Sequence, residues 1–138
     1  MRCRLAERRR SMSLWKISYI SVAVDPADMI EAVIADICAV ALVRNAVLDI
    51  TGVLTFRDGR FAQVIEGPEA ALRELMAGIT RDPRHHSLVV VADGPLEMRR
   101  YSDWRMAYRE PKDFVRDQLD IVLEQTALMG QVVSDRLN

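Results

Sequence analysis

Long apolar runs, cysteine and net charge are all scarce in this sequence, and each scarcity excludes a class of protein. No run approaches the roughly 18 to 20 apolar residues that a membrane-spanning helix needs, so we expect no membrane segment. The two cysteines, Cys3 and Cys38, fit neither a metal-binding spacing nor a disulfide framework, which favours a reducing cytoplasm. A net charge of -1 argues against a nucleic-acid-binding surface.

The sequence contains one patterned domain, with segments of different character at its two ends. Its 138 residues suffice for a single buried core. Residues 1–13 carry five arginines against one glutamate and no apolar stripe, so we expect a basic flexible leader, with an arm for nucleic acid or anionic lipid as the alternative. Residues 14–110 form the patterned domain. Residues 111–138 repeat apolar side chains at helical spacing, and we expect a C-terminal helical extension there.

Apolar periodicity predicts five strands and two helices in the order βαββαββ. The strands are expected at residues 14–21, 50–56, 61–67, 87–92 and about 101–108. Asp58-Gly59 predicts a hairpin between the second and third strands. This order predicts a ferredoxin-like α+β sandwich, in which a five-stranded mixed sheet has the two helices on one face and the C-terminal helices on the other.

The expected helices both begin at a proline, which suits a first helical turn. We expect Asp25 to be the N-cap of the first helix, Met29 to lie in its buried stripe, and the helix to end near Asn45. The second helix is expected to begin at Pro68.

Motifs for phosphate chemistry or metal binding are missing from the sequence. It has no Walker or G-x-G-x-x-G pattern. The segment Ser21 to Asp25, which follows the first predicted strand, has neither glycine nor arginine to hold an anion, and this counts against an acylphosphatase-like hydrolase. His85 and His86 lack the accompanying cysteine or carboxylate spacing of a metal site. We therefore expect a protein that is not an enzyme and has no metal site.

Three neutral polar residues lie where this pattern places hydrocarbon side chains. Tyr19 and Gln63 fall on the apolar faces of their strands, whereas Asn45 continues the helix stripe of Ile37 and Ala41. A buried amide without partners costs about 1 to 3 kcal/mol, so these side chains need hydrogen-bonding partners. Together they predict a slot between helix and sheet that fits a flat heteroaromatic ligand with donors and acceptors along its edge.

Each of these residues also has an ordinary structural interpretation. Tyr19 is compatible with a core tyrosine whose hydroxyl is satisfied, and Asn45 with a helix C-cap in the left-handed region. Gln63 is compatible with an edge strand, and Trp104 and Met106 with core filler. The convergence on one slot favours a binding site over these separate interpretations.

Six short motifs occur in order along the domain. They are Ile17-Ser18-Tyr19-Ile20-Ser21, Arg44-Asn45, Ile50-Thr51-Gly52-Val53-Leu54, Phe61-Ala62-Gln63-Val64-Ile65-Glu66-Gly67, Arg81-Asp82-Pro83-Arg84-His85 and Trp104-Arg105-Met106. Each motif alone is weak, whereas six at compatible spacing are specific. Through them the chain from about Leu14 to Tyr108 resembles the BLUF family, the blue-light sensors that use a flavin.

The resemblance implies a role for each matching position. Tyr19 matches the photoactive tyrosine that donates an electron and a proton, and Gln63 matches the glutamine between that tyrosine and the flavin N5 and O4 edge. Asn45 matches the side chain that pairs with the N3 and C4 carbonyl edge, and Arg84 the cation near the C2 carbonyl. The other implied binding residues are Ile37 and His85, which flank the ring faces, together with Phe61, Asp82 and Met106.

The resemblance also implies a signalling route. Light triggers proton-coupled electron transfer from Tyr19, after which Gln63 rotates or tautomerises and exchanges its hydrogen bonds. Trp104 and Met106 match a pair on the last strand that exchanges places and is linked to output. We expect these two side chains to alternate onto one face of that strand and to relay the change to the C-terminal helices.

The implied cofactor is FAD, bound non-covalently, with FMN or riboflavin as alternatives because no glycine-rich clamp for the adenine and phosphates is visible. About 30 residues follow the domain, too few for a cyclase or phosphodiesterase, so we expect a separate effector protein and self-association into a homo-oligomer. No nucleic-acid or membrane partner is expected, and the expected location is the cytoplasm. The alternative function is a non-photoactive ferredoxin-like module that binds another ligand or a protein.

Overall fold

The computed structural model describes residues 13–119, which fall into two compact units, one that ends at Tyr108 and one that begins at Arg109. In the second unit, residues 111–119 are helical. Nearly all of the predicted leader and most of the predicted C-terminal extension lie outside the described residues. The placement of C-terminal helices on the open face of the sheet stays a prediction.

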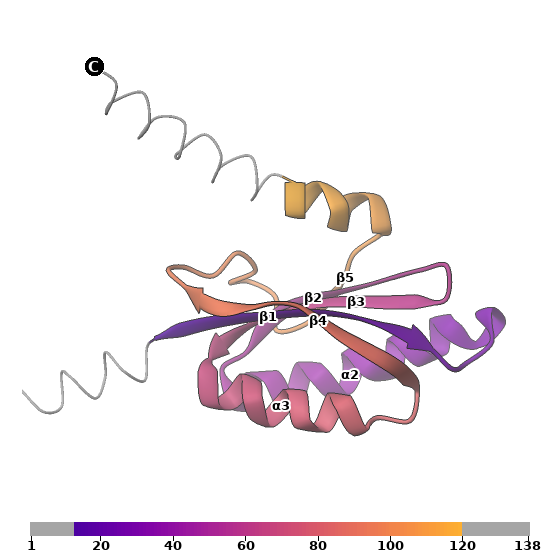
Figure 1. Ribbon diagram of the computed structural model, residues 1–138, viewed down its shortest axis with the longest axis horizontal. Coiled ribbons are helices and arrows are strands. Elements are labelled where there is room, and N and C mark those ends of the chain that lie inside the picture. Colours follow the sequence, from indigo (N-terminus) through magenta and orange to yellow (C-terminus); the bar gives the residue numbers. More distant parts are fainter. Residues whose placement is uncertain (1–12, 120–138) are drawn as a thin grey trace, which may run out of the picture. The chain divides into compact units, whose positions relative to one another are not determined.

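A five-stranded mixed sheet forms the centre of the first unit (Figure 1). Its strands are β1 (Leu14–Ala23), β2 (Thr51–Arg57), β3 (Arg60–Pro68), β4 (His85–Leu96) and β5 (Ala107–Tyr108). They lie in the order β4-β1-β3-β2-β5, and all neighbours are antiparallel except the parallel pair β2 and β5. The predicted ferredoxin-like order is thus confirmed. Because β3 is the central strand, the interpretation of Gln63 as an edge-strand residue is wrong.

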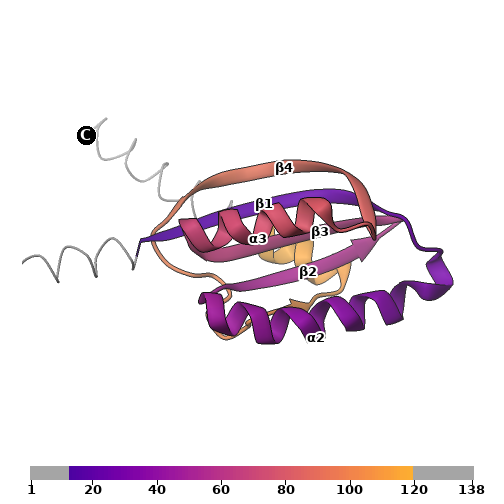
Figure 2. The same ribbon diagram turned by 90° about the horizontal axis from the view of Figure 1, so that it is seen from below.

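Two helices, α2 (Ile30–Leu48) and α3 (Glu69–Arg81), lie on the same face of the sheet, as Figures 1 and 2 both show. α3 buries one side, because Leu72, Leu75 and Met76 recur at the spacing of a single helix face. These side chains pack on the sheet in one apolar core with Ile17 and Ile65, which are almost fully buried. The predicted slot therefore lies in the same layer as this core, between the sheet and the two helices.

The chain enters α2 differently from the sequence expectation. A short 3-10 helix, η1 (Ala27–Met29), precedes α2, and neither helix has a side-chain cap, so Asp25 is not the predicted N-cap. Met29 is 52% exposed rather than buried. Pro26 still begins the helical region, because Pro26 itself is the N-cap of η1.

The end of α2 also differs from the expectation. The helix continues to Leu48, and Asp49, with a φ of 57°, is the left-handed C-cap. Asn45 therefore lies inside the helix, and its interpretation as a C-cap is wrong. Only three charged residues, Glu31, Asp36 and Arg44, occur among the 19 residues of α2, so apolar residues cover every side and leave no clear phase to bound the helix. No helix within residues 13–119 is long and apolar enough to cross a membrane.

The predicted hairpin between β2 and β3 is present. Asp58 and Gly59 have φ angles of 51° and 78°, and the flanking Arg57 and Arg60 are paired. Two successive positive φ angles are typical of the turn that matches the twist of paired strands. This short connection sets the register in which Gln63 lies opposite Leu54.

The predicted fifth strand is wrong over most of its length. Only Ala107 and Tyr108 form a strand, so Trp104 and Met106 lie before β5 and do not alternate along it. The backbone of the preceding segment is bonded elsewhere. The Glu66 carboxylate accepts two of its N–H groups, and the Asn45 amide donates to one of its carbonyl groups. These side-chain contacts replace a strand ladder.

Candidate functional site

A hollow of about 510 Å³, part of which is open solvent, lies between the sheet and the two helices of the first unit. The residues that line it are Tyr19, Leu54, Phe61 and Gln63 from β1 to β3, Ile37, Val40 and Arg44 from α2, Ile79 from α3, Asp82 and Arg84 from the loop after α3, and His85 from the start of β4. Seven of these are among the site residues predicted from the sequence.

Tyr19 and Gln63 form a hydrogen-bonded pair in this hollow. They are direct partners in the antiparallel register of β1 and β3, which places their side chains on one face. The Tyr19 hydroxyl donates to Gln63 Oε1, and Gln63 Nε2 lies 3.6 Å from the Met106 sulfur, which it faces as a donor. Both side chains are about 95% buried or more. The amide therefore bridges a phenol and a thioether.

Burial controls the protonation of Tyr19. It raises the pKa of the phenol far above its ordinary value, because a phenolate would lose its hydration there. The positive charge of Arg44 lowers this pKa in part, and the negative charge of Asp82 raises it further. Tyr19 is consequently a protonated hydrogen-bond donor throughout the neutral pH range.

Asp82 and Arg84 form an ion pair that orients the arginine at the hollow. Arg84 Nη2 lies 2.5 Å from Asp82 Oδ2, and its Nε lies 3.0 and 3.1 Å from the two carboxylate oxygens. The backbone N–H of Arg84 also donates to Asp82 Oδ1 at 2.9 Å. These hydrogen bonds lower the pKa of Asp82 and raise the pKa of Arg84.

Arg44 is a second cation of the site, and it was absent from the predicted binding residues. Its Nε donates to Asn45 Oδ1 at 3.3 Å, but within residues 13–119 it forms no ion pair with a carboxylate. Partial burial lowers the pKa of its guanidinium. Helical spacing could have found it, because Ile37, Val40 and Arg44 lie at i, i+3 and i+7 on α2.

His85 is held by contacts to both ring nitrogens. Its Nε2 lies 2.5 Å from the Ile79 carbonyl oxygen, and its Nδ1 lies 2.7 Å from Ser21 Oγ. A carbonyl can only accept, so Nε2 carries a proton, and Ser21 Oγ is the hydrogen-bond partner of Nδ1. The ring meets Tyr19 and Phe61 edge to face, with centroids 6.2 and 6.5 Å apart.

Asn45, Met106 and Trp104 lie outside the lining of the hollow. Asn45 is fully buried and its Nδ2 donates to the Arg105 carbonyl at 2.6 Å. Met106 is also buried and reaches the site through Gln63. The Trp104 ring stacks on Tyr101, with centroids 5.7 Å apart, and does not line the hollow. The predicted residues therefore form two groups: those that line the hollow, and those that contact the residues or backbone next to it.

The lining suits a flat ring system with polar atoms along its edge. Aliphatic side chains approach from several sides, and Val40, Leu54 and Ile79 add to the predicted Ile37. Gln63 has two amide protons, and its one acceptor among residues 13–119 is the weakly accepting Met106 sulfur. Arg44 adds a guanidinium without a carboxylate partner there. Spare donors among aliphatic walls fit a heteroaromatic ring that carries carbonyl groups.

A ferredoxin-like sandwich with a buried tyrosine–glutamine pair facing such a hollow is typical of a domain that binds a small molecule. Residues 14–107 match the BLUF family, described as sensors of blue-light using FAD, and the chain therefore belongs to that family. It is a blue-light sensor domain that uses a flavin. The domain of this family senses light and is not itself catalytic.

Known relatives and structures agree with this assignment. The chain is 36% identical over 94 residues to the photoactivated adenylate cyclase subunit beta of Euglena gracilis, a match that covers 68% of this chain and 11% of that protein. The chain thus spans about a tenth of the length of this curated relative. The dark-state structure of BlrB, a BLUF protein, has a TM-score of 0.68 and 34% identity, covering 80% of this chain and 86% of that one. Klebsiella pneumoniae BlrP1, solved with FMN and cyclic diGMP, has a TM-score of 0.62 and 31% identity, covering 70% and 26%.

Proposed function

We propose that this domain binds FAD non-covalently in the hollow and converts blue light into a change in the hydrogen bonds of Gln63. The observation that carries the proposal is the buried pair of Tyr19 and Gln63, whose side chains face the hollow together. Ile37, Val40 and Phe61 supply apolar contacts for the ring. Arg84, oriented by its ion pair, supplies a cation for a ring carbonyl.

When bound, the flavin supplies the blue-light absorption and an excited state that oxidises a neighbouring phenol. With the flavin bound, Tyr19 would supply one electron and would pass its hydroxyl proton along the existing hydrogen bond to Gln63 Oε1. Once Oε1 carries the proton, it would donate to the Tyr19 oxygen instead of accepting from it, and this reversal would favour rotation or tautomerisation of the amide. Its Nε2 then leaves the Met106 sulfur, so the change reaches the segment before β5.

FAD is preferred to FMN as the proposed cofactor because the family description names it. FMN stays an alternative, since a structural relative was solved with FMN and this chain has no glycine-rich clamp for an adenine dinucleotide. Equilibrium titration of the apoprotein with FAD, FMN and riboflavin compares the three directly. An apoprotein that binds none of them, and develops no flavin absorption band, would show that the chain is the alternative non-photoactive module.

Gln63→Leu is expected to abolish the light-induced red shift of the flavin absorption while the yellow band persists. Leucine has a similar size but no donor or acceptor, so the ring stays bound and the hydrogen-bond exchange is lost. A light-minus-dark absorption spectrum of the reconstituted variant measures the effect. Gln118→Leu, the same change on the helix of residues 111–119, is the matched control and keeps the red shift. A normal red shift in Gln63→Leu contradicts the glutamine switch.

We further propose that the output passes to an effector protein and that the chain self-associates. The support is that a relative named a photoactivated adenylate cyclase carries a matching segment within a much longer chain. A separate effector and a homo-oligomer both require an exposed surface for association. Light scattering on the purified protein in darkness and under blue light determines the oligomeric state in each condition.

A further inference from the structure

Glu66 is a buried carboxylate that the proposed photochemistry does not use. It is fully buried on β3, three residues after Gln63, and so points to the opposite face of the strand. Its Oε2 accepts the backbone N–H of Arg100 at 2.7 Å, and its Oε1 accepts the backbone N–H of Tyr101 at 2.9 Å. The Thr51 hydroxyl donates to Oε1 at 3.2 Å. Every one of these contacts uses the carboxylate as an acceptor.

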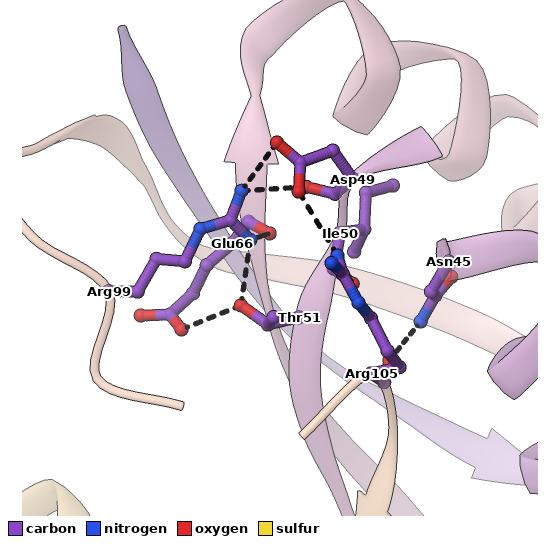
Figure 3. A network of polar contacts seen from close by, with 7 residues as sticks. All are labelled: Asn45, Asp49, Ile50, Thr51, Glu66, Arg99 and Arg105. Carbon is purple, nitrogen blue, oxygen red and sulfur yellow. Dashed lines mark hydrogen bonds and ion pairs between the residues drawn. The ribbon is translucent and has the colours of Figure 1, made fainter. Parts of the chain in front are cut away.

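Arg99 extends this contact to the ends of β2 and β3 (Figure 3). Its Nη1 donates to Thr51 Oγ1 at 2.9 Å and to the Glu66 backbone carbonyl at 3.2 Å. Its Nη2 donates to the Asp49 carbonyl at 2.8 Å and lies 3.1 Å from the Asp49 carboxylate. Residues 99–101 are therefore fastened to the sheet by Glu66 and Asp49. We call residues 99–106 the clamped segment.

The other end of the clamped segment is fastened to the same region. Arg105 Nη1 lies 3.1 Å from Asp49 Oδ1 and 3.3 Å from the Ile50 carbonyl, so Asp49 receives an arginine from each end of the segment (Figure 3). Asn45 donates to the Arg105 carbonyl at 2.6 Å. Between the two ends, the backbone N–H of Gly52 donates to the Trp104 carbonyl at 2.9 Å.

These fastenings determine where the two side chains near the output lie. Trp104 stacks on Tyr101, whose backbone N–H is held by Glu66. Met106 follows Arg105 directly and contacts the Gln63 amide. If the hydrogen bonds from Glu66 to the backbone of residues 100 and 101 are lost, Tyr101 is no longer fixed beneath the Trp104 ring. Trp104 is therefore displaced first, and the position of Met106 becomes less restricted.

We propose that Glu66 is a positioning residue that holds the clamped segment so that Met106 meets Gln63 and Trp104 stays on Tyr101. The expected effect on the light response rests on the proposed function. The expected position of Trp104 does not, because it can be measured in the protein without flavin. A carboxylate that accepts two backbone N–H groups is suited to this task, because charged acceptors form the stronger hydrogen bonds. A glutamine at this position keeps one acceptor oxygen, but its NH₂ group then faces one of the two backbone N–H groups and cannot accept from it.

The test replaces Glu66 by glutamine in a Trp15→Phe background, where Trp104 is the remaining tryptophan. Loss of a hydrogen bond to a charged group is expected to raise the population of displaced segment about tenfold. In the apoprotein the emission of Trp104 shifts and acrylamide quenches it more strongly. In the flavin-loaded protein the initial red shift is retained, since Tyr19 and Gln63 are unchanged, and the rate of dark recovery changes about tenfold.

Glu69→Gln, the same chemical change on the exposed surface of α3, is the control and leaves Trp104 emission and dark recovery as they are. A Glu66→Gln variant that only unfolds at lower urea, with unchanged quenching and recovery, overturns the proposal and makes Glu66 a purely structural residue. Arg99→Gln serves if Glu66→Gln does not fold, and unchanged Trp104 emission in that variant also overturns it. If the protein does not bind flavin, the proposed function is wrong, whereas the measurement of Trp104 emission in the apoprotein still tests the role of Glu66.

Discussion

Asp82 and Arg84 lie two residues apart at the hollow, and their contacts make one contribution to stability depend on pH. Because the folded pKa of Asp82 is lowered, this stabilisation is complete above the unfolded pKa of about 3.9 and is lost as the pH falls through the folded pKa. We expect Asp82→Asn to lower the free energy of unfolding by about 0.5 to 1 kcal/mol at pH 7, a modest value because the pair is partly hydrated. Urea unfolding at pH 7 and near pH 3 measures it, and the difference from the wild type shrinks at the lower pH.

Asp28→Asn is the matched control for this measurement, because Asp28 is exposed in η1. Its effect is expected to be similar at both pH values. A deficit of Asp82→Asn that does not shrink at low pH would mean that the asparagine disturbs the loop rather than the ion pair.

Single residues of the site differed in how far the sequence could place them. Strand phase put Tyr19 and Gln63 on one face, and the structure brings them together as a hydrogen-bonded pair. Asn45 was placed on the correct helix, but its carbonyl partner lies 60 residues away, and no local pattern contains such a contact. Arg44 is absent from the predicted binding residues because a charged residue on an apolar stripe is ordinarily assigned to the solvent.

Among the elements, the pairing of β2 with β3 depends on a residue without a side chain. Gly52 lies opposite Ile65, and a Cβ at this position would lie 2.4 Å from the Val64 carbonyl oxygen. We expect Gly52→Ala to lower the free energy of unfolding by about 2 to 4 kcal/mol, since the contact is with backbone that cannot move aside cheaply. Urea unfolding measures the change.

Gly94→Ala on β4 is the control for this prediction. A Cβ there meets nothing within 4 Å and the residue has no positive φ, so a change below about 1 kcal/mol is expected. Equal stability of the two alanine variants would contradict the close approach of β2 and β3 at Gly52.

The elements that the sequence placed well are those whose signals are local. The hairpin follows from Asp58-Gly59 alone, and α3 follows from its amphipathic spacing. The start and end of α2 were misplaced because apolar residues surround it, and the segment before β5 was read as a strand because its partners are Glu66 and Asn45, distant side chains rather than a neighbouring strand. Alternation in a sequence does not reveal which groups will bond its backbone.

At the scale of the whole molecule, α2 exposes apolar side chains to solvent. Val43 and Val47, four residues apart and therefore on one side of the helix, are 71% and 81% exposed. Exposed apolar groups that lie together bind hydrophobic dyes and favour association. We expect the double change Val43→Gln and Val47→Gln to reduce the fluorescence of bound anilinonaphthalene sulfonate by about half, with little change in stability because neither side chain is buried.

Met98→Gln is the control, because Met98 is 71% exposed in the segment between β4 and β5. Its effect on dye binding is expected to be small. An equal fall in dye fluorescence for both variants would contradict a shared apolar surface at Val43 and Val47.

The register that pairs Tyr19 with Gln63 also fixes when the site can form during folding. The two residues are 44 positions apart, whereas β2 and β3 are joined by a two-residue turn. Local pairings form before distant ones, because closing a longer loop costs more chain entropy. We therefore expect the hairpin to form before β1 docks, and the hollow requires that docking because Tyr19 is part of its lining. A ligand held between Tyr19 and α2 binds only chains whose sheet is complete, and by mass action it draws incompletely folded chains toward that state.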